Sequence, residues 1–128
     1  PIDAVNFDKS ASVVVAANLP YTVVATVTVP VGHEGVLKFV GQGADQPGVF
    51  TDTTWQLTVD RKPVPDWGTV GLQRGTIAAP TPVTILLAPN ALVELWIRNN
   101  TGTVYTNAYG ILRGWTWSVR AMRQGSLG

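Results

Sequence analysis

Apolar and polar residues alternate along much of this chain of 128 residues. In the run 21–29 the odd positions are apolar and the even positions are mostly threonine, and the runs 55–60 and 115–120 repeat the alternation. Such a pattern places one set of side chains toward a core and the other toward solvent, because successive residues of a β-strand point to opposite faces. The pattern predicts half-buried strands, and no window carries a convincing helical stripe.

The run 92–98 shows the same alternation with a mixed second face. Val93, Leu95 and Ile97 share one face, which predicts that they are buried. Trp96 falls on the other face, between two charged residues. Trp96 is therefore expected on the outer face, either exposed or lying flat against its own domain.

The run 83–87 is almost wholly apolar and predicts a central strand, while 12–17 and 36–40 predict shorter strands. Clusters of proline, glycine and asparagine separate all of these runs, as turns require. About seven or eight short strands with regular turns predict an all-β fold, an antiparallel β-sandwich that is jelly-roll-like. The pattern fits an immunoglobulin-like strand order equally well.

The chain divides into three parts along this pattern. Residues 1–20 are expected to form an N-terminal arm or first strand, 21–120 the sandwich domain and 121–128 a C-terminal tail. Residues 1–11 are polar and mixed, which predicts an extended arm or an edge strand added to a neighbour. The stretches 41–52 and 63–80 are irregular and predict long loops of the kind that often bind partners.

Composition narrows the function. Charged residues make up 13% of the chain, against about 25% in a typical soluble domain. The chain has no cysteine, one histidine and a formal net charge of +1. These values exclude thiolate and multi-histidine metal sites, and they supply no basic surplus for binding nucleic acid or a membrane surface. A weakly charged surface loses little hydration when it is buried against other chains.

Chemistry-bearing motifs are scarce. His33 lies in a glycine-flanked loop, and no serine stands on a Gly-x-Ser-x-Gly elbow. No pair of carboxylates has the apolar setting that a glycosidase acid needs, and Asp60 is expected to lie in a hairpin turn. No phosphate loop, calcium loop or dinucleotide fingerprint occurs. We expect no enzymatic activity, no catalytic residue, no metal and no cofactor.

The five tryptophans are the strongest functional signal. Trp55, Trp115 and Trp117 alternate in phase with apolar neighbours and are expected in the core. Trp96 and Trp67 either lie flat against their own domain or are exposed, where aromatic rings can stack on sugars or anchor a protein interface. We expect partner contacts at the following interface candidates: Pro1, Ile2, Asp3, Val5, Phe7, Trp67, Trp96, Tyr105 and Tyr109.

Turn and core residues recur in a recognisable order over about residues 29–117. The segments are Val29-Pro30-x-Gly32-x-x-Gly35-Val36-Leu37, Trp55-Gln56-Leu57-Thr58-Val59-Asp60-Arg61-Lys62-Pro63-Val64, Pro80-Thr81-Pro82, Val93-Glu94-Leu95 with Asn99-Asn100, and Gly114-Trp115. This order resembles the capsid decoration, or cement, proteins of tailed bacteriophages. The resemblance implies a jelly-roll-like sandwich, often a homotrimer, seated on the outer capsid where major capsid protein subunits meet. It implies no enzymatic activity and no cofactor.

The residues and the resemblance together lead to one expectation and one alternative. We expect a non-enzymatic virion structural protein that is made in the host cytoplasm and stabilises the capsid exterior. Its partners would be the major capsid protein and further copies of itself, without nucleic acid or membrane. The alternative is a carbohydrate-binding or adhesion module, such as a phage head fibre or tail component, that uses exposed aromatic residues.

Overall fold

The computed structural model describes residues 4–18, 20–44, 53–64, 80–100, 102 and 105–119, and for residues 53 and 105–107 it describes the backbone alone. The described residues are almost all in β-strands. The strands, in chain order, are β1 (Val5–Val15), β2 (Thr22–Thr28), β3 (His33–Ala44), β4 (Thr53–Val59), β5 (Lys62–Pro63), β6 (Thr81–Leu87), β7 (Leu92–Asn99) and β8 (Tyr105–Ser118).

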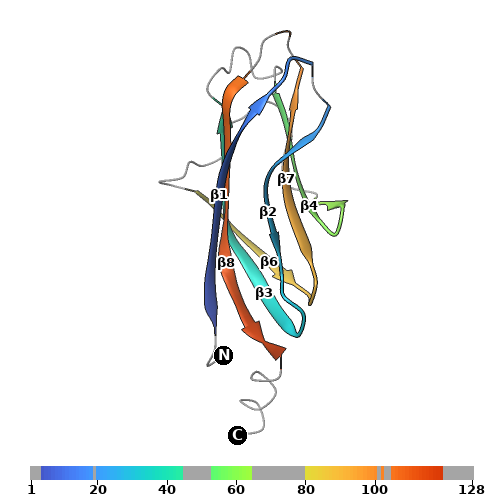
Figure 1. The fold of residues 1–128 in the computed structure, drawn as a ribbon. Coiled ribbons are helices and arrows are strands. Elements are labelled where there is room, and N and C mark those ends of the chain that lie inside the picture. Colours follow the sequence, from blue (N-terminus) through green and yellow to red (C-terminus); the bar gives the residue numbers. More distant parts are fainter. Residues whose placement is uncertain are drawn as a thin grey trace, which may run out of the picture.

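The strands form two antiparallel four-stranded sheets that pack face to face (Figure 1). One sheet has the order β1-β8-β3-β6 and is called the β8 sheet below; the other has the order β2-β7-β4-β5 and is called the β7 sheet. The pairs β1–β8, β2–β7, β3–β6 and β4–β5 alternate between the two sheets, as in a long hairpin that has been rolled up. This is the jelly-roll arrangement. The predicted sandwich is therefore confirmed, and of the two strand orders that the sequence leaves open the molecule has the jelly roll.

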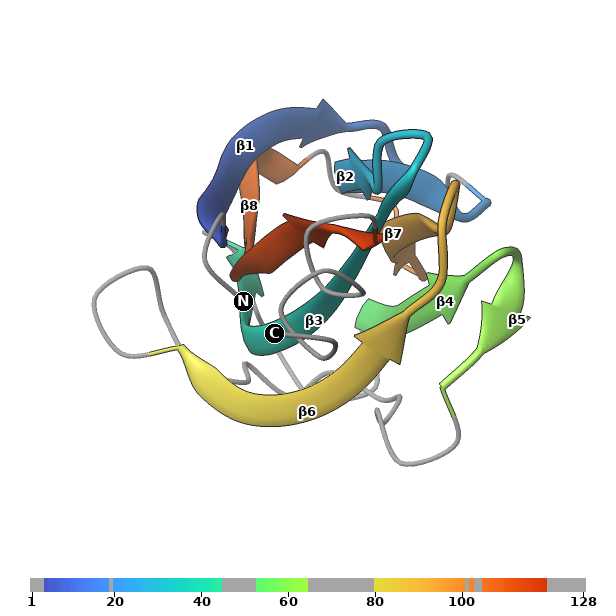
Figure 2. The same cartoon turned by 90° about the horizontal axis from the view of Figure 1, so that it is seen from below.

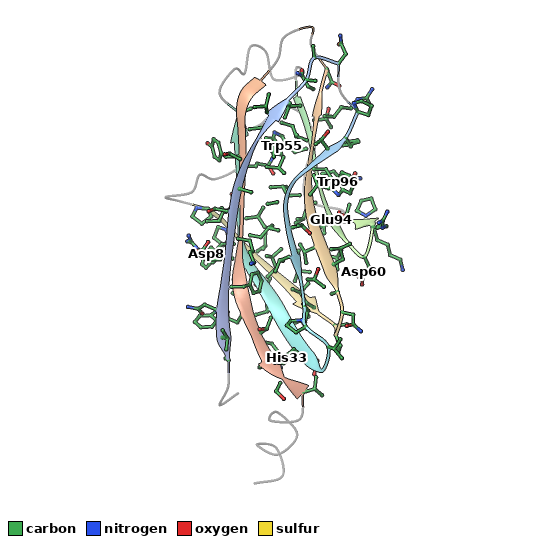
Figure 3. The ribbon with its side chains drawn as sticks, in the orientation of Figure 1. Asp8, His33, Trp55, Asp60, Glu94 and Trp96 are labelled. Carbon is green, nitrogen blue, oxygen red and sulfur yellow. The ribbon has the colours of Figure 1, made fainter. Side chains whose placement is uncertain are left out.

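The core lies between the sheets and confirms the alternation where it is regular. Val93, Leu95 and Ile97 of β7 are fully buried, as predicted, and Trp55 of β4 is 3% exposed. Figure 3 shows the Trp55 side chain between the two layers. Burial of such side chains stabilises the fold by about 1.5–3 kcal/mol each.

The apolar run 83–87 is not a central strand, contrary to the prediction. β6 forms one edge of the β8 sheet (Figure 2), and Leu86 is 78% exposed. Val83 and Ile85 pack against the core, so the intervening positions of the strand face outward. Pro82 is compatible with this place, because an edge strand leaves one row of backbone donors unpaired and can lack one of them.

β3 is longer than the sequence indicates. Gly41–Ala44 were expected to begin a loop, but they continue the strand and pair with β8 as far as Ala108. Gly43 lies beneath the ring of Tyr109, where a Cβ atom would collide with it, and Gln42 is 1% exposed. Glycine here therefore marks a close approach within a strand rather than a turn. The rest of the expected loop, 45–52, lies outside the described residues, as do 65–79.

Residues 5–11 do not form an arm that leaves the domain. They belong to β1, which pairs with β8 of the same chain in an uninterrupted register from Val5 to Val13. The backbone hydrogen bonds of this ladder hold the segment against its own sheet. Residues 1–3 and the predicted tail 121–128 lie outside the described residues.

A candidate interaction site on the outer face of the β8 sheet

The two outer faces of the sandwich differ in chemistry. In the β7 sheet, the residues that alternate with the core are mostly polar, as expected where one face of an antiparallel sheet meets water. They include Thr26, Thr54, Gln56, Thr58 and Arg98. In the β8 sheet, the corresponding positions include Val36, Phe39, Leu86, Tyr109, Ile111 and Trp115, alongside charged residues such as Asp8, Glu34 and Arg113. The outer face of the β8 sheet is therefore the unusual surface of this molecule.

An apolar row crosses three neighbouring strands of this face. Val36 of β3 pairs with Leu86 of β6 on one side and with Trp115 of β8 on the other. Leu86 is 78% exposed and Trp115 is 43% exposed. Directly opposed residues of an antiparallel ladder lie close enough to form one continuous surface. This row is called the apolar band below.

A β-bulge in β3 adds polar groups next to the apolar band. The register of β3 shifts between Leu37 and Phe39 relative to both β6 and β8. Relative to β8, β3 advances two residues where β8 advances one, so Lys38 is the extra residue of this pair; relative to β6, the extra residue belongs to β6, between Pro82 and Ile85. Leu37 and Val40 are both fully buried although they stand three positions apart, in agreement with the bulge at Lys38. Bulges bend a strand and turn a side chain in a new direction. Here the Lys38 ammonium donates a hydrogen bond to the Thr84 hydroxyl of β6, with 3.1 Å between Nζ and Oγ1.

A groove of about 230 Å³ lies beside the bulge. Its lining consists of Asn6, Phe7, Asp8, Lys38, Phe39, Arg113, Gly114 and Trp115. Within it, Arg113 Nε lies 3.3 Å from Asp8 Oδ2, an ion pair between β8 and β1. Figure 3 shows Asp8 on the outer side of the β8 sheet. A second hollow shares Lys38 and Phe39 and extends toward β6.

The groove combines aromatic walls with cationic hydrogen-bond donors. Lys38 carries three N–H donors and Arg113 five, whereas Asp8 contributes one carboxylate. Tryptophan, tyrosine and arginine are the residues most often found at the energetic centre of protein interfaces. The groove is therefore suited to recognise a group that accepts hydrogen bonds and bears apolar neighbours.

One of the three tryptophans predicted in the core lies there, and the other two lie on the outer face of the β8 sheet. Trp55 is in the core, as predicted, but Trp115 is exposed and Trp117 is half-buried on the outer side of β8. The alternation was identified correctly, but the face was not, because both faces of β8 carry apolar residues. Arg113 shares the face of Trp115 in β8, and this charge is the signal that identifies the outward side.

Trp96 does lie on the outer face of the β7 sheet, on the opposite side of the molecule from Asp8 (Figure 3). It is half-buried, and its Nε1 donates a hydrogen bond to the Thr58 hydroxyl at 3.0 Å. The ring is therefore held against its own sheet. The groove and Trp96 do not form a common site.

The remaining interface candidates are scattered. Val5 is 63% exposed, whereas Phe7 packs partly against the core and lines the groove. Tyr109 is half-buried over Gly43, on the same outer face as Trp115. The following candidates lie outside the described residues or side chains: Pro1, Ile2, Asp3, Trp67 and Tyr105.

Beside the groove, the described part of the chain offers no cluster of metal ligands and no membrane-spanning helix. His33 begins β3, and its Nδ1 lies 3.2 Å from the Val31 carbonyl oxygen. No three acidic or histidine side chains are grouped to hold a metal ion within the described ranges. The described strands and turns include no helix long and apolar enough to cross a membrane. No protein-family model matches this chain, and no curated protein matches it.

Proposed function

We propose that this protein is a structural binding protein that docks on a larger protein assembly through the outer face of its β8 sheet. In the specific form of the proposal it is a capsid decoration protein of a tailed bacteriophage that bridges subunits of the major capsid protein. The observation that carries the proposal is the apolar band of Leu86, Val36 and Trp115. Apolar surface gathered on one face of a soluble domain is typical of an interaction site.

The edges of the sheets favour docking by a face over docking by strand addition. β5 is two residues long, β2 carries a register shift between Val23 and Ala25, and β6 contains Pro82. In β1, Lys9 pairs with the core residue Leu112 and therefore occupies a core-facing position of an edge strand. Short edges, bulges, prolines and inward lysines all hinder pairing with another chain.

The low charge of the chain supports the same proposal. With 13% charged residues, a docking face has few charges to desolvate, and uncompensated desolvation of charge is the main cost of burying a polar surface. A protein that binds the assembled lattice and not the separate subunits stabilises the lattice by mass action. A decoration protein would act in this way without any chemical step.

The test is co-sedimentation of the purified protein with shells of the major capsid protein from the same virus. Trp115→Thr is expected to weaken binding at least about tenfold, since central aromatic anchors contribute more than about 1.4 kcal/mol. Leu86→Thr is expected to weaken binding too, because it removes apolar surface from the docking face. The control is Val31→Thr, because Val31 is 81% exposed in the turn before β3, away from the apolar band. Unchanged binding by Trp115→Thr, or equal loss in Val31→Thr, would refute the proposal. The homotrimer that the resemblance to decoration proteins implies is tested by sedimentation of the protein by itself.

Carbohydrate binding is the second candidate, and the groove is the observation that favours it. Trp115 lies opposite Asn6 in the ladder, with Asp8 and Arg113 in the next row. An exposed aromatic ring beside amide, carboxylate and guanidinium groups can hold a sugar. A single sugar ring in the groove would nevertheless leave Leu86 uncovered, so protein docking accounts for more of this face.

A further inference from the structure

The groove beside the Lys38 bulge holds a surplus of positive charge. We infer that it receives the carboxylate of an aspartate or glutamate side chain of the docking partner, with apolar residues on either side of that acid. The inference rests on the proposed docking function and names the chemistry that the partner presents. Lys38 and Arg113 are the two cations, and Asp8 is the carboxylate already present. The Lys38 side chain lines both the groove and the second hollow, and its ammonium reaches Thr84 of the second hollow.

Lys38 is the group with unused donors. Its ammonium carries three N–H donors, and the recorded hydrogen bond to Thr84 Oγ1 uses one of them. Within the described part of the chain, no carboxylate pairs with Lys38, whereas Arg113 pairs with Asp8 through Nε. One incoming carboxylate would therefore balance the charges of the groove and accept hydrogen bonds from the Lys38 donors that Thr84 does not use.

Among the described residues, the other acid on the outer face of β3 does not supply this charge. Glu34 precedes the apolar band on β3, and it pairs with Trp117 of β8. The row formed by Val36 and Trp115 stands between Glu34 and the groove. Glu34 thus lies on the other side of the apolar band from Lys38.

The size of the groove limits what can enter it. About 230 Å³ is less than the roughly 300–1,000 Å³ of pockets that hold drug-sized ligands. One side chain fits the groove better than a cofactor does, and the adjoining hollow of about 490 Å³ that shares Lys38 and Phe39 leaves room for the residues that flank it. Phe39 and Trp115 wall the groove and continue into the apolar band, so the residues that flank the acid are expected to be apolar.

A protein partner is favoured over an acidic sugar because of what lies next to the groove. Leu86 is 78% exposed at the far end of the apolar band. Its aliphatic side chain gains from contact with apolar groups, which a partner protein supplies and a uronic acid does not. The ion pair itself would be partly exposed and would contribute more to specificity than to affinity.

The experiment is an NMR titration of the isolated ¹⁵N-labelled protein. Its result does not depend on the shell-binding assay that tests the docking function. The probes are acetyl-Leu-Glu-Leu-amide, the matched acetyl-Leu-Gln-Leu-amide, and glucuronate. We expect the glutamate peptide to shift the Trp115 indole and Arg113 Nε–H signals with saturation. The glutamine peptide is expected to bind about fivefold more weakly, which is the upper range for a partly exposed ion pair.

Variants locate the binding to the groove. Lys38→Met is expected to reduce the affinity for the glutamate peptide to that for the glutamine peptide, while Lys38→Arg retains the preference. Lys62→Met is the matched control, because Lys62 is exposed on β5 of the opposite sheet. Retention of the preference in Lys38→Met would overturn the inference.

Other outcomes also decide the matter. Equal affinity for the two peptides, the absence of saturation, or shifts centred away from the groove would overturn the inference. Tighter binding of glucuronate than of the glutamate peptide would replace the protein acid by an acidic sugar. If Trp115→Thr abolishes shell binding and the peptides do not discriminate, the docking function stands and this inference alone fails.

Discussion

Gly114 of β8 and Phe7 of β1 are direct partners in the ladder, and the Phe7 ring lies where a side chain of residue 114 would have to go. A Cβ atom at position 114 would stand 2.7 Å from Phe7 Cζ and would also collide with the backbone carbonyl of Val36. Phe7 can therefore reach from the edge strand toward the centre of the sheet. Gly114 also lines the groove, so the same residue contacts both the core side chain of Phe7 and the groove.

Gly114→Ala is expected to lower the free energy of unfolding by about 1–3 kcal/mol, as overpacking of a tight contact does. The Val36 backbone cannot move aside as easily as a flexible side chain. The control is Gly102→Ala, since nothing lies within 4 Å of a Cβ placed there. Urea denaturation of both variants checks the prediction, and equal stability of Gly114→Ala and the wild type would contradict it.

Asp60 holds the β4–β5 hairpin to the start of β7. Asp60 and Arg61 form a two-residue turn with φ angles of 52° and 66°, the backbone of a type I′ hairpin. The Asp60 carboxylate accepts a hydrogen bond from Leu92 N at 2.9 Å, which confirms the predicted turn residue.

Asp60→Ala is expected to cost about 1–2 kcal/mol, because it removes this acceptor and places alanine at a positive φ. Asp60→Asn should retain most of the stability, since asparagine keeps an acceptor oxygen and tolerates that backbone conformation. Thermal denaturation of the two variants gives the comparison. A loss in Asp60→Asn as large as that in Asp60→Ala would show that the charge, and not the hydrogen bond, matters.

Glu94 is a buried acid on the outer side of the β7 sheet. It is 8% exposed, and its Oε1 atom has no hydrogen-bond partner among the residues that the structure describes. Glu94→Met is expected to raise the free energy of unfolding by about 1 kcal/mol, because an apolar side chain of similar size avoids an unsatisfied buried oxygen. Glu34→Met on the other sheet is the control with a less buried acid. Chemical denaturation that shows Glu94→Met to be less stable than the wild type would mean that the carboxylate is stabilised in a way that the geometry does not record.

Lys9 is expected to keep β1 from pairing with another chain. Lys9→Val places an apolar residue at a core-facing position of the edge strand, so that a second strand can be added without burying a charge. We expect association that increases with protein concentration, measured by sedimentation velocity, while Lys9→Arg stays like the wild type. Identical sedimentation of Lys9→Val and the wild type would show that the edge is protected by other means.

The sequence predicted the buried residues between the two sheets better than it predicted the outward residues of β8. The buried row of β7 and the burial of Trp55 follow from alternation, because that strand has one polar and one apolar face. β8 could not be assigned in this way, since Leu112 faces the core while Ile111, also buried, alternates with it. Trp115 was therefore assigned to the wrong face.

Two kinds of local irregularity were also beyond a pattern of strict alternation. Gly41 and Gly43 resemble a turn in sequence, yet both lie in β3, and Gly43 lies there beneath the Tyr109 ring, which requires space above the strand. The bulge at Lys38 is defined by pairing with β8, a strand distant in sequence that no local window contains. Neither the groove nor the ion pair between Asp8 and Arg113 could be derived without the register of β1 on β8.

The extra residue in β3 has a consequence for how such a protein can diversify. Because Leu37 and Val40 keep their places in the core on either side of Lys38, the gain or loss of one codon at this point would rebuild the outward surface and leave the interior intact. Recognition could then change by insertion and deletion within a strand, a route usually associated with loops.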